Sequence, residues 1–587
     1  MPDILDALDE QQRAAAECVS GPVAIFAGAG TGKTRTITHR IAHAVASGVH
    51  DPSQTLAVTF TTRAAGELRN RLGQLGVSGV QVRTFHSAAL RQLRFFYPQF
   101  FNSSMPDLMP SKFRFVADAA TLCRVANDKD SIRDLSAEIE WAKVNILSPD
   151  AYREKASEVR RDLSGDLTIE KVSKVFEAYL SRMDEANAMD FEDVLLLTTA
   201  MMENYPEMAN AVRKQYRHFT VDEFQDVSPV QFELLSLWLG DRDDVCVVGD
   251  PAQTIYSFSG ATSKYLIDFK SHFARTQDFQ LSHSYRSTEP IVAVANQVLA
   301  KDATSPVRLV SQRGKGPDVN LTSYASDEEE AKQIGKQILS YISNGITPRE
   351  IAVLYRINSQ SEIFEAELSA LGVPISLRGA ERFFERVEVK NALLHLRAGL
   401  HVAGTKSVAE TVRDILSSVG WRAQAPENGR AARETWESLN TIVDLADELQ
   451  TKDSTAQLPD FVKSLDLRSE MEFAPSANAV TLASIHAAKG LEWEAVFIAG
   501  VSEGLLPISH ATTAAEFNEE RRLLYVAMTR AKTHLNVSWA KSRHTDGKGY
   551  REQSTLLRDL KVSFFTSSAK PGTHCANSSR TENSDSS

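Results

Sequence analysis

The stretch Ala27-Gly-Ala-Gly-Thr-Gly-Lys-Thr34 sets the interpretation of the other parts of this 587-residue chain. It directly follows the apolar run 23–26 and precedes a helical pattern, which is the strand–loop–helix setting of a phosphate-binding loop. Glycines let backbone N–H groups turn inward around a phosphate, Lys33 can reach the β- and γ-phosphates, and the Thr34 hydroxyl suits Mg²⁺. The pattern therefore predicts a nucleotide site in an α/β domain, with a cradle formed by Gly28, Ala29, Gly30, Thr31, Gly32, Lys33 and Thr34.

Short apolar runs bounded by turn residues recur along the chain and are typical of buried parallel strands. Helical patterns separate most of them, which favours two doubly wound α/β domains. The stretches 89–189 and 381–478 lack such runs and have the pattern of amphipathic helices, so we expect one helical insertion in each domain. The predicted strands are 23–27, 56–60, 80–85, 218–221 and 245–248 in the N-terminal part, then 279–281, 351–355, 480–485, 495–500 and 535–539.

Two adjacent acids follow another predicted strand, in Phe219-Thr-Val-Asp-Glu-Phe-Gln-Asp226. They lie at the carboxyl end of the strand, where open α/β sheets bind ligands. Asp222 suits a magnesium ion, and Glu223 can orient or deprotonate the attacking water. The alternative is that both acids cap a helix. The phosphate-binding loop favours the catalytic interpretation.

A third strand ends in Val247-Val-Gly-Asp-Pro-Ala-Gln-Thr-Ile-Tyr256. Gln253 carries both a donor and an acceptor, so it can sense a γ-phosphate. The alternative is that Gly249-Asp250-Pro251 forms only a turn. Because this segment follows a strand of the same predicted sheet, we favour the sensor.

Arginines further along the chain supply the cations that phosphoryl transfer needs as charge spreads over the equatorial oxygens. The candidates are Arg286 and Arg530, although a single arginine is most often a surface residue. Tyr285 and Arg35 could stack on the two faces of an adenine.

Composition excludes several other classes of protein. The chain carries 65 Lys+Arg and 76 Asp+Glu, a net charge of −11, so any nucleic-acid binding must use local patches. No apolar run approaches the ~20 residues of a membrane span, and the acidic start lacks the features of a signal peptide, so we expect a cytoplasmic protein. The four cysteines are more than 100 residues apart, which argues against a disulfide framework or a cysteine-bound metal cluster.

Taken in order, nine motifs resemble the UvrD/PcrA/Rep type of superfamily 1 DNA helicase, over residues 8–540. The resemblance implies two RecA-like motor domains with helical inserts, ATP hydrolysis between them, and 3′→5′ movement along single-stranded DNA. The motifs are AGAGTGKT, TFTTRAA, RTFHS, VDEFQD, VVGDPAQTIYSFSGA, SYRS, VLYRINSQS, SIHAAKGLEWEAVF and EERRLLYVAMTRA.

The resemblance also assigns roles to individual residues. Gln12 would read the adenine edge, Glu492 would contact the ribose, and Arg286 and Arg530 would contact the γ-phosphate. The residues expected along the DNA groove, or coupled to it, are Arg63, Phe85, His86, Tyr256, Phe258, Arg356 and His486.

The helicase resemblance suggests domain boundaries. Motor domain 1A would comprise residues 1–88 and 190–278, around insertion 1B at 89–189. Motor domain 2A would comprise 279–380 and 479–562, around a short insertion 2B at 381–478. Residues 563–587 are rich in Ser, Thr and Asn with few large apolar groups, so we expect them to be disordered.

A basic segment offers a second indication of nucleic-acid binding. Residues 61–100 hold six arginines and one glutamate, interleaved with aromatic side chains. Cations and stacking faces together suit single-stranded nucleic acid. The alternative is that the aromatic residues are core and the arginines coat a helix.

Some features depart from the helicase pattern. Phe258-Ser259-Gly260 stands where the family commonly has Trp-Arg-Gly, and Thr62-Arg63 replaces the usual Asn-Lys. The 381–478 insertion holds 12 basic and 16 acidic residues, a net charge of −4. Beside a helicase, we therefore keep two alternatives open: a translocase that displaces bound proteins but unwinds poorly, and a nucleotide-dependent DNA-binding switch.

The helicase interpretation implies ATP and Mg²⁺ as cofactors. Its expected partners are single-stranded DNA, junctions between single- and double-stranded DNA, and repair or replication proteins. The protein would act as a monomer or a weak dimer, away from any membrane.

Overall fold

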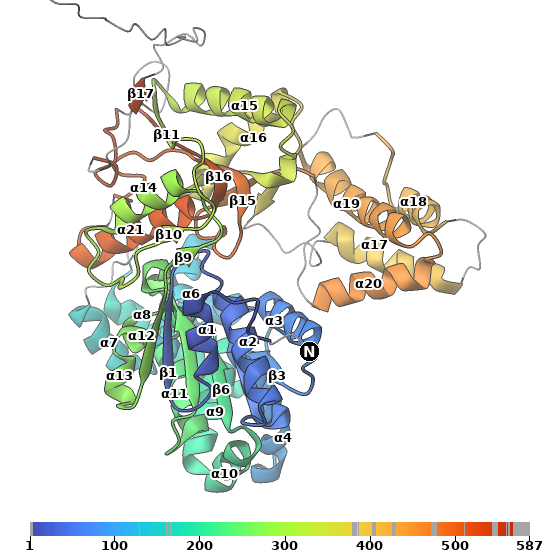
Figure 1. Ribbon diagram of the computed structural model, residues 1–587. Helices are drawn as coiled ribbons and strands as arrows, with labels where there is room; N and C mark the ends of the chain where they lie inside the picture. The colour runs from blue at the N-terminus through green and yellow to red at the C-terminus, as the bar shows by residue number, and fades with distance from the viewer. Residues whose placement is uncertain are drawn as a thin grey trace, which may run out of the picture.

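The computed structural model describes residues 4–566, apart from 128, 160–162, 164–166, 379–383, 385–386, 402–406, 425–429, 471–477, 510, 543–549, 559 and 561–563. Two parallel sheets dominate it, one above the other in Figure 1, and a helical lobe lies to one side. Among the described residues, no helix is both long and apolar enough to cross a membrane. The predicted class, two α/β units with helical insertions, is confirmed.

The first sheet has six parallel strands in the order β3-β2-β6-β7-β1-β8. Helices α1 to α3 pack on one face, and α4, α9 and α11 pack on the other, so the sheet is doubly wound. Its strands are β1 (Val23–Ala27), β2 (Thr55–Thr59), β3 (Gln81–Thr84), β6 (His218–Val221), β7 (Val245–Gly249) and β8 (Gln277–Leu281). Its helices are α1 (Glu10–Glu17), α2 (Lys33–Ala46), α3 (Thr62–Gln74), α4 (Phe85–Phe100), α9 (Phe191–Asn204), α10 (Pro206–Gln215), α11 (Pro229–Leu239), α12 (Lys264–Ile267) and α13 (Phe269–His272).

The predicted boundary at 278/279 falls inside β8. This strand pairs with β1, with Phe279 opposite Ile25, and so belongs to the first sheet. The strand lies at the sheet edge and its pattern is largely exposed, so its sequence contains no signal of which sheet it joins.

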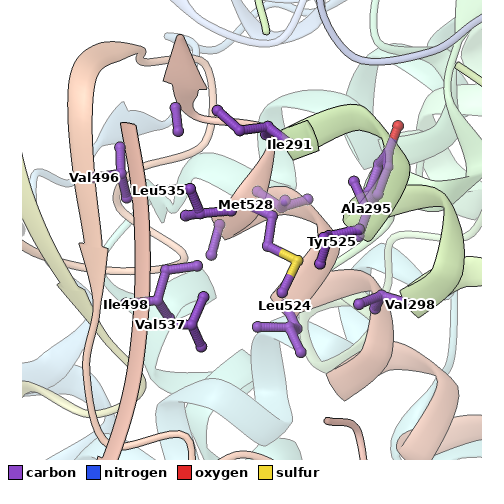
Figure 2. Close-up of a cluster of buried hydrophobic side chains, with 14 of the residues drawn as sticks. Ile291, Ala295, Val298, Val496, Ile498, Leu524, Tyr525, Met528, Leu535 and Val537 are labelled. Carbon is purple, nitrogen blue, oxygen red and sulfur yellow. The ribbon is translucent and has the colours of Figure 1, made fainter. Parts of the chain in front are cut away.

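The second sheet has seven parallel strands in the order β13-β14-β12-β15-β16-β11-β17. Figure 2 shows how α14 and α21 pack their apolar side chains against β15 and β16, while α15 and α16 cover the other face. The strands are β11 (Asn320–Tyr324), β12 (Ile351–Tyr355), β13 (Ile375–Arg378), β14 (Val480–Ser484), β15 (Trp493–Ile498), β16 (Ala531–Ala540) and β17 (Phe564–Thr566). The helices are α14 (Glu289–Leu299), α15 (Asp327–Ser343), α16 (Ser361–Ala370) and α21 (Ala514–Met528).

Sequence patterns missed three strands of this sheet, β11, β13 and β17. The first two are short and polar, so they lack the apolar run that marked the others. β17 lies within the segment expected to be disordered from 563 onward and pairs with β11. Residues 567–587 lie outside the described part of the chain.

Each insertion has a hydrophobic core of its own. The first contains α5 (Phe113–Leu122), α6 (Lys129–Val144), α7 (Pro149–Glu158) and α8 (Ile169–Glu185). The second contains α17 (Val387–Ala398), α18 (Val408–Ser418), α19 (Arg430–Lys452) and α20 (Leu458–Glu470), and forms the lobe at the right of Figure 1. The short strand pairs are β4 (Asp107–Leu108) with β5 (Ala188–Met189), and β9 (His283–Ser284) with β10 (Val310–Ser311). The predicted start of the first insertion at 89 falls within α4, and the start of the second at 381 falls outside the described residues.

Stability should fall in mild acid because of His50, which is 4% exposed at the amino-terminal edge of the first sheet. Its ring stacks on His218, which bonds to Asp244, and burial together with His218 lowers the pKa of His50 from 6.5 to about 4. A lowered pKa stabilises the fold above pH 6.5, and that stability is lost as the pH falls toward 4. We expect His50→Gln to reduce the loss of unfolding free energy between pH 7 and pH 4.5 by about 2 kcal/mol.

Thermal unfolding at the two pH values measures this effect. The exposed His272 provides the control, as His272→Gln. Equal acid sensitivity in the His50 variant and the parent protein would contradict the prediction.

Candidate nucleotide site and nucleic-acid groove

The phosphate-binding loop has the geometry that its glycines allow. Gly30 and Gly32 have φ values of 74° and 81°, in the left-handed region where glycine is favoured. A Cβ added at Gly30 would lie 2.7 Å from the Cβ of Arg286, and one at Gly32 would lie 2.7 Å from the Gln12 amide nitrogen. The loop therefore permits close approach both of a ligand and of these two side chains.

Lys33 and Thr34 begin α2 immediately after the loop. The Lys33 ammonium donates to the Ala27 carbonyl, 3.2 Å away, which holds the side chain back across the loop. Backbone N–H groups and a lysine at a helix N-terminus provide an anion site suited to a triphosphate.

The residues expected around the base lie together beside the loop. Gln12 is buried and donates its amide to the Thr31 carbonyl at 2.9 Å. Tyr285 donates its hydroxyl to Asp9, and Arg35 donates to a backbone carbonyl of the same N-terminal segment. Tyr285 remains 46% exposed, which leaves a ring face available for stacking.

The two acids lie at the carboxyl end of β6 in different electrostatic states. Burial and the neighbouring Glu223 raise the pKa of Asp222 to about 7, although Lys33 opposes the shift. For Glu223, burial alone would raise the pKa, but Lys33 and Lys489 outweigh burial and hold the pKa below its usual value. Glu223 is therefore the ionised acid of the pair. The Asp222 carboxyl is buried, and too little positive charge lies near it to keep its pKa in the usual range.

Glu223 also has a special backbone conformation, with φ of 52°. Few residues other than glycine adopt left-handed backbone, and such strain persists where the surroundings impose it. The side chain accepts a 2.6 Å bond from the Gln225 amide, which fixes its direction.

Gln253 belongs to a buried network that joins the two sheets. Its side-chain amide donates to Asp250 at 2.8 Å, and its side-chain oxygen accepts from the Arg530 guanidinium at 3.4 Å. The Tyr525 hydroxyl lies 3.5 Å from the same Asp250 and accepts the Ala29 N–H at 3.3 Å. Tyr525 lies in α21, and Arg530 lies in the turn between α21 and β16, so the network joins the phosphate loop to the second sheet.

Both candidate arginines lie close together where the second sheet meets the first. Arg530 is 1% exposed, and burial followed by the nearby Arg286 lowers the pKa of Arg530 to about 9. Arg286 bonds to Glu492 at 2.6 Å, and Lys532 lies 3.0 Å from the same carboxylate. These two cations overcome burial and lower the pKa of Glu492 to about 2. Two arginines held close together favour an additional anion between the sheets.

Lys489, which sequence reasoning did not single out, enters the pocket from the second sheet. Its ammonium donates to the Asp226 carboxylate at 2.5 Å and to the main-chain carbonyl of Gln253 at 2.7 Å. The same ammonium lies 5.0 Å from the centre of the Tyr256 ring. These partners come together only in the fold. The one indication in the sequence that Lys489 belongs to the site is its position within the motif SIHAAKGLE.

Three of the predicted DNA-facing residues cluster across the two sheets. The Tyr256 hydroxyl donates to the His486 carbonyl at 3.0 Å. The Phe258 ring packs edge-on against the His486 ring at 5.8 Å and is 58% exposed. An exposed ring beside a half-buried aromatic pair is an arrangement suited to stacking bases.

Phe85, expected along the DNA groove or coupled to it, is a core residue and offers no exposed surface for direct contact. Phe85 is 1% exposed and stacks on Trp238, because it begins α4 on the side that faces the sheet. The adjacent His86 is half-buried, and its ring contacts Phe191, which is 54% exposed. Sequence reasoning missed Phe191, whose only signal is its aromatic type at the start of a helix.

Two predicted cations, Arg63 and Arg356, come from different sheets. Arg63 lies half-buried in the first turn of α3, near the carboxyl end of β2. Arg356 lies close enough to His486 to lower the pKa of that histidine, but its guanidinium forms a buried ion pair with Glu520 at 2.8 Å. The Arg356 guanidinium is thus paired with a protein carboxylate.

Comparison with known proteins agrees with this geometry. The sequence profile of the UvrD/REP helicase N-terminal domain matches residues 8–274, and that of the UvrD-like helicase C-terminal domain matches residues 279–426 and 401–542. The chain belongs to the UvrD/REP helicase family. The resemblance inferred from its motifs is thereby confirmed.

Relatives in this helicase family match nearly the whole chain. The ATP-dependent DNA helicase UvrD2 of Mycobacterium tuberculosis is 44% identical over 574 residues, 95% of this chain and 82% of the relative. UvrD1 of the same organism is 30% identical, covering 95% of this chain and 85% of the relative. PcrA of Staphylococcus aureus is 26% identical, covering 96% of this chain and 88% of that helicase.

Proposed function

We propose that this UvrD/REP family member is an ATP-dependent DNA helicase that moves 3′→5′ on single-stranded DNA and unwinds the duplex ahead, in DNA repair or replication. The observation that carries the proposal is the meeting of two sheets at one pocket. The first sheet contributes Lys33, Asp222 and Glu223, and Arg286 and Arg530 approach from the side of the second. A nucleotide between them would link the separation of the sheets to the state of the phosphates.

In this mechanism Lys33 and the loop amides hold the β- and γ-phosphates, and Glu223 accepts a proton from the attacking water. Arg286 and Arg530 compensate the charge that develops on the γ-phosphoryl oxygens. Asp222 and Thr34 fit a magnesium ion, since they are a carboxylate and a hydroxyl, and the raised pKa of Asp222 reflects negative charge in need of a cation. When bound, this ion supplies charge compensation at the phosphates.

Coupling to DNA follows from Lys489 and Gln253. Lys489 contacts Asp226 next to the catalytic acids, and it also lies over Tyr256 at the groove. A shift of the second sheet upon hydrolysis would therefore move His486 relative to Tyr256 and Phe258. Movement requires that ATP bind differently to the two arrangements of the sheets.

We propose motor domains that follow the sheets. The first would end after β8 rather than at residue 278, and the second would begin with the segment that carries β9. The helices α5–α8 and α17–α20 would be the 1B and 2B insertions, each with its own core.

Strand displacement on duplexes with a single tail tests the direction of movement. We expect ATP-dependent unwinding of a duplex with a 3′ tail and little unwinding with a 5′ tail. Lys33→Ala is the matched control, because it removes the phosphate cation and should abolish unwinding with either tail. Faster unwinding from a 5′ tail would contradict the proposed polarity.

One observation favours a second candidate, a translocase that displaces proteins from DNA. The 381–478 insertion carries a net charge of −4, which disfavours a strong grip on duplex phosphates. The same tailed substrates distinguish the two functions when a tightly bound protein is placed on the tail. Displacement of that protein without strand separation would favour the translocase.

A further inference from the structure

Lys532 is a cation beside the nucleotide site to which the proposed mechanism gives no role. It is the second residue of β16, and its ammonium lies 3.0 Å from Oε1 of Glu492, the residue before β15. The other carboxylate oxygen, Oε2, accepts from Nε of Arg286 at 2.6 Å. Burial opposes ionisation of Glu492, but Arg286 and Lys532 lower its pKa to about 2. One carboxylate charge is therefore shared by two cations.

Backbone hydrogen bonds fix these side chains relative to one another. The Thr288 N–H donates to the Lys532 carbonyl at 3.1 Å, and the Ser287 hydroxyl donates to the Ala531 carbonyl at 2.6 Å. These bonds join the residues that follow Arg286 to the start of β16. Because β15 also pairs with β16, the three charged groups project from one connected part of the second sheet.

Arg286 has one nitrogen left for a phosphate. Its Cβ lies beside the phosphate loop, since a Cβ added at Gly30 would be 2.7 Å from it. Its Nε donates to Glu492, and its Nη1 donates to the Thr529 carbonyl at 3.2 Å. Among the residues that the structure describes, Nη2 has no hydrogen-bond acceptor. Nη2 is therefore the donor left for a γ-phosphoryl oxygen.

The pairing of Lys532 with Glu492 bears directly on that donor. An arginine and a carboxylate favour two parallel N–H···O bonds, and the Nε and Nη2 groups of a guanidinium form one such fork. In the fork, Nη2 of Arg286 would donate to Oε1 of Glu492. Lys532 occupies Oε1 instead, so Arg286 keeps a single bond to the carboxylate.

We infer that Lys532 is a positioning residue for ATP hydrolysis, which holds Glu492 so that Nη2 of Arg286 stays free for the γ-phosphoryl group. The inference rests on the proposed function and adds a residue to it. Without Lys532, Glu492 would bind both Nε and Nη2 of Arg286. Less positive charge would then compensate the phosphoryl oxygens as the bond to the leaving group breaks.

Hydrolysis at saturating ATP and single-stranded DNA measures the effect. We expect Lys532→Gln to lower kcat by about 5-fold, as for a hydrogen bond between charged groups that solvent partly screens. KM should change less than kcat, because the lost interaction belongs to the transition state. Lys532→Arg keeps a cation on Glu492 and should restore kcat.

Glu492→Gln distinguishes the positioning role from a direct one. Glutamine has no negative charge to hold Arg286 in a fork, so Lys532→Gln should not lower kcat further in the Glu492→Gln background. Equal falls in kcat in the two backgrounds would mean that Lys532 acts on the nucleotide or on the fold by itself. That result would overturn the inference.

Binding of ADP together with aluminium fluoride, which mimics the phosphoryl group in transfer, gives a readout that does not depend on turnover. We expect Lys532→Gln to weaken this complex by about 5-fold and to leave the affinity for ADP alone unchanged. The unfolding temperature without nucleotide should stay parental, because an ion pair this exposed adds little to stability.

The matched control is Lys541→Gln, which removes the same charge just beyond the other end of β16. Lys541 is nine residues further along the chain, roughly 30 Å away at ~3.3 Å per residue, so its loss should change neither kcat nor affinity. Parental values for Lys532→Gln in both assays would overturn the inference. A parent protein that does not hydrolyse ATP with DNA would instead contradict the proposed function.

Discussion

Replacing Glu223 by glutamine is expected to lower the DNA-stimulated kcat by about 10²- to 10⁴-fold, the contribution typical of a positioned general base. Glutamine keeps the shape of the side chain, and the Gln225 amide that donates to Glu223 retains an acceptor. Only the ability to take a proton from water is lost. Because Glu223 is the ionised acid of the pair, its loss also removes negative charge near the phosphates, so ATP should bind at least as tightly as to the parent.

Steady-state hydrolysis with saturating single-stranded DNA and equilibrium binding of a fluorescent ATP analogue measure the two effects. Glu330→Gln is the control, since Glu330 is a buried carboxyl that belongs to α15 on the second sheet. Burial raises the pKa of Glu330 to about 7, and its carboxyl accepts the Gly500 N–H, a bond that glutamine can keep. A Glu223 variant that hydrolyses ATP at the parental rate would exclude Glu223 as the base.

The sequence was sufficient for the parts of the molecule that local pattern defines. Central strands such as β1, β2, β6 and β12 are buried apolar runs, and buried runs carry a strong signal. The strands β11 and β13 are polar and short, and their membership in the sheet comes from pairing alone. β8 shows the same limit. Its apolar run could be recognised in the sequence, but its pairing with β1 could not.

Site residues divide in the same way. Lys33, Asp222 and Gln253 follow strands in a fixed local setting, so their convergence could be predicted from spacing. The burial of Phe85 and the pairing of Arg356 with Glu520 depend on helices that are distant in sequence. Lys489 could not be predicted for the same reason, because its contacts with Asp226 and Gln253 join residues more than 200 positions apart.

Arg530 is a buried cation beside a second arginine, so its environment is unfavourable without an anionic ligand. It is 1% exposed, and burial and Arg286 lower its pKa to about 9. A cation held in this way is stabilised when a phosphate charge enters the pocket. We expect Arg530→Gln to lower kcat by about 10³-fold or more, as for an arginine that compensates charge in phosphoryl transfer.

Thermal unfolding distinguishes this catalytic role from a structural one. The substitution removes a buried charge that repels Arg286, so the unfolding temperature without nucleotide should not fall. The rise in unfolding temperature on adding a nonhydrolysable ATP analogue should shrink, because part of the binding free energy is lost. Arg521→Gln, in the preceding helix α21, is the control, because Arg521 is 6% exposed and donates to the Val298 carbonyl, so kcat should stay near the parental value. A fall in unfolding temperature without nucleotide for Arg530→Gln, with parental kcat, would assign Arg530 to the fold rather than to ATP hydrolysis.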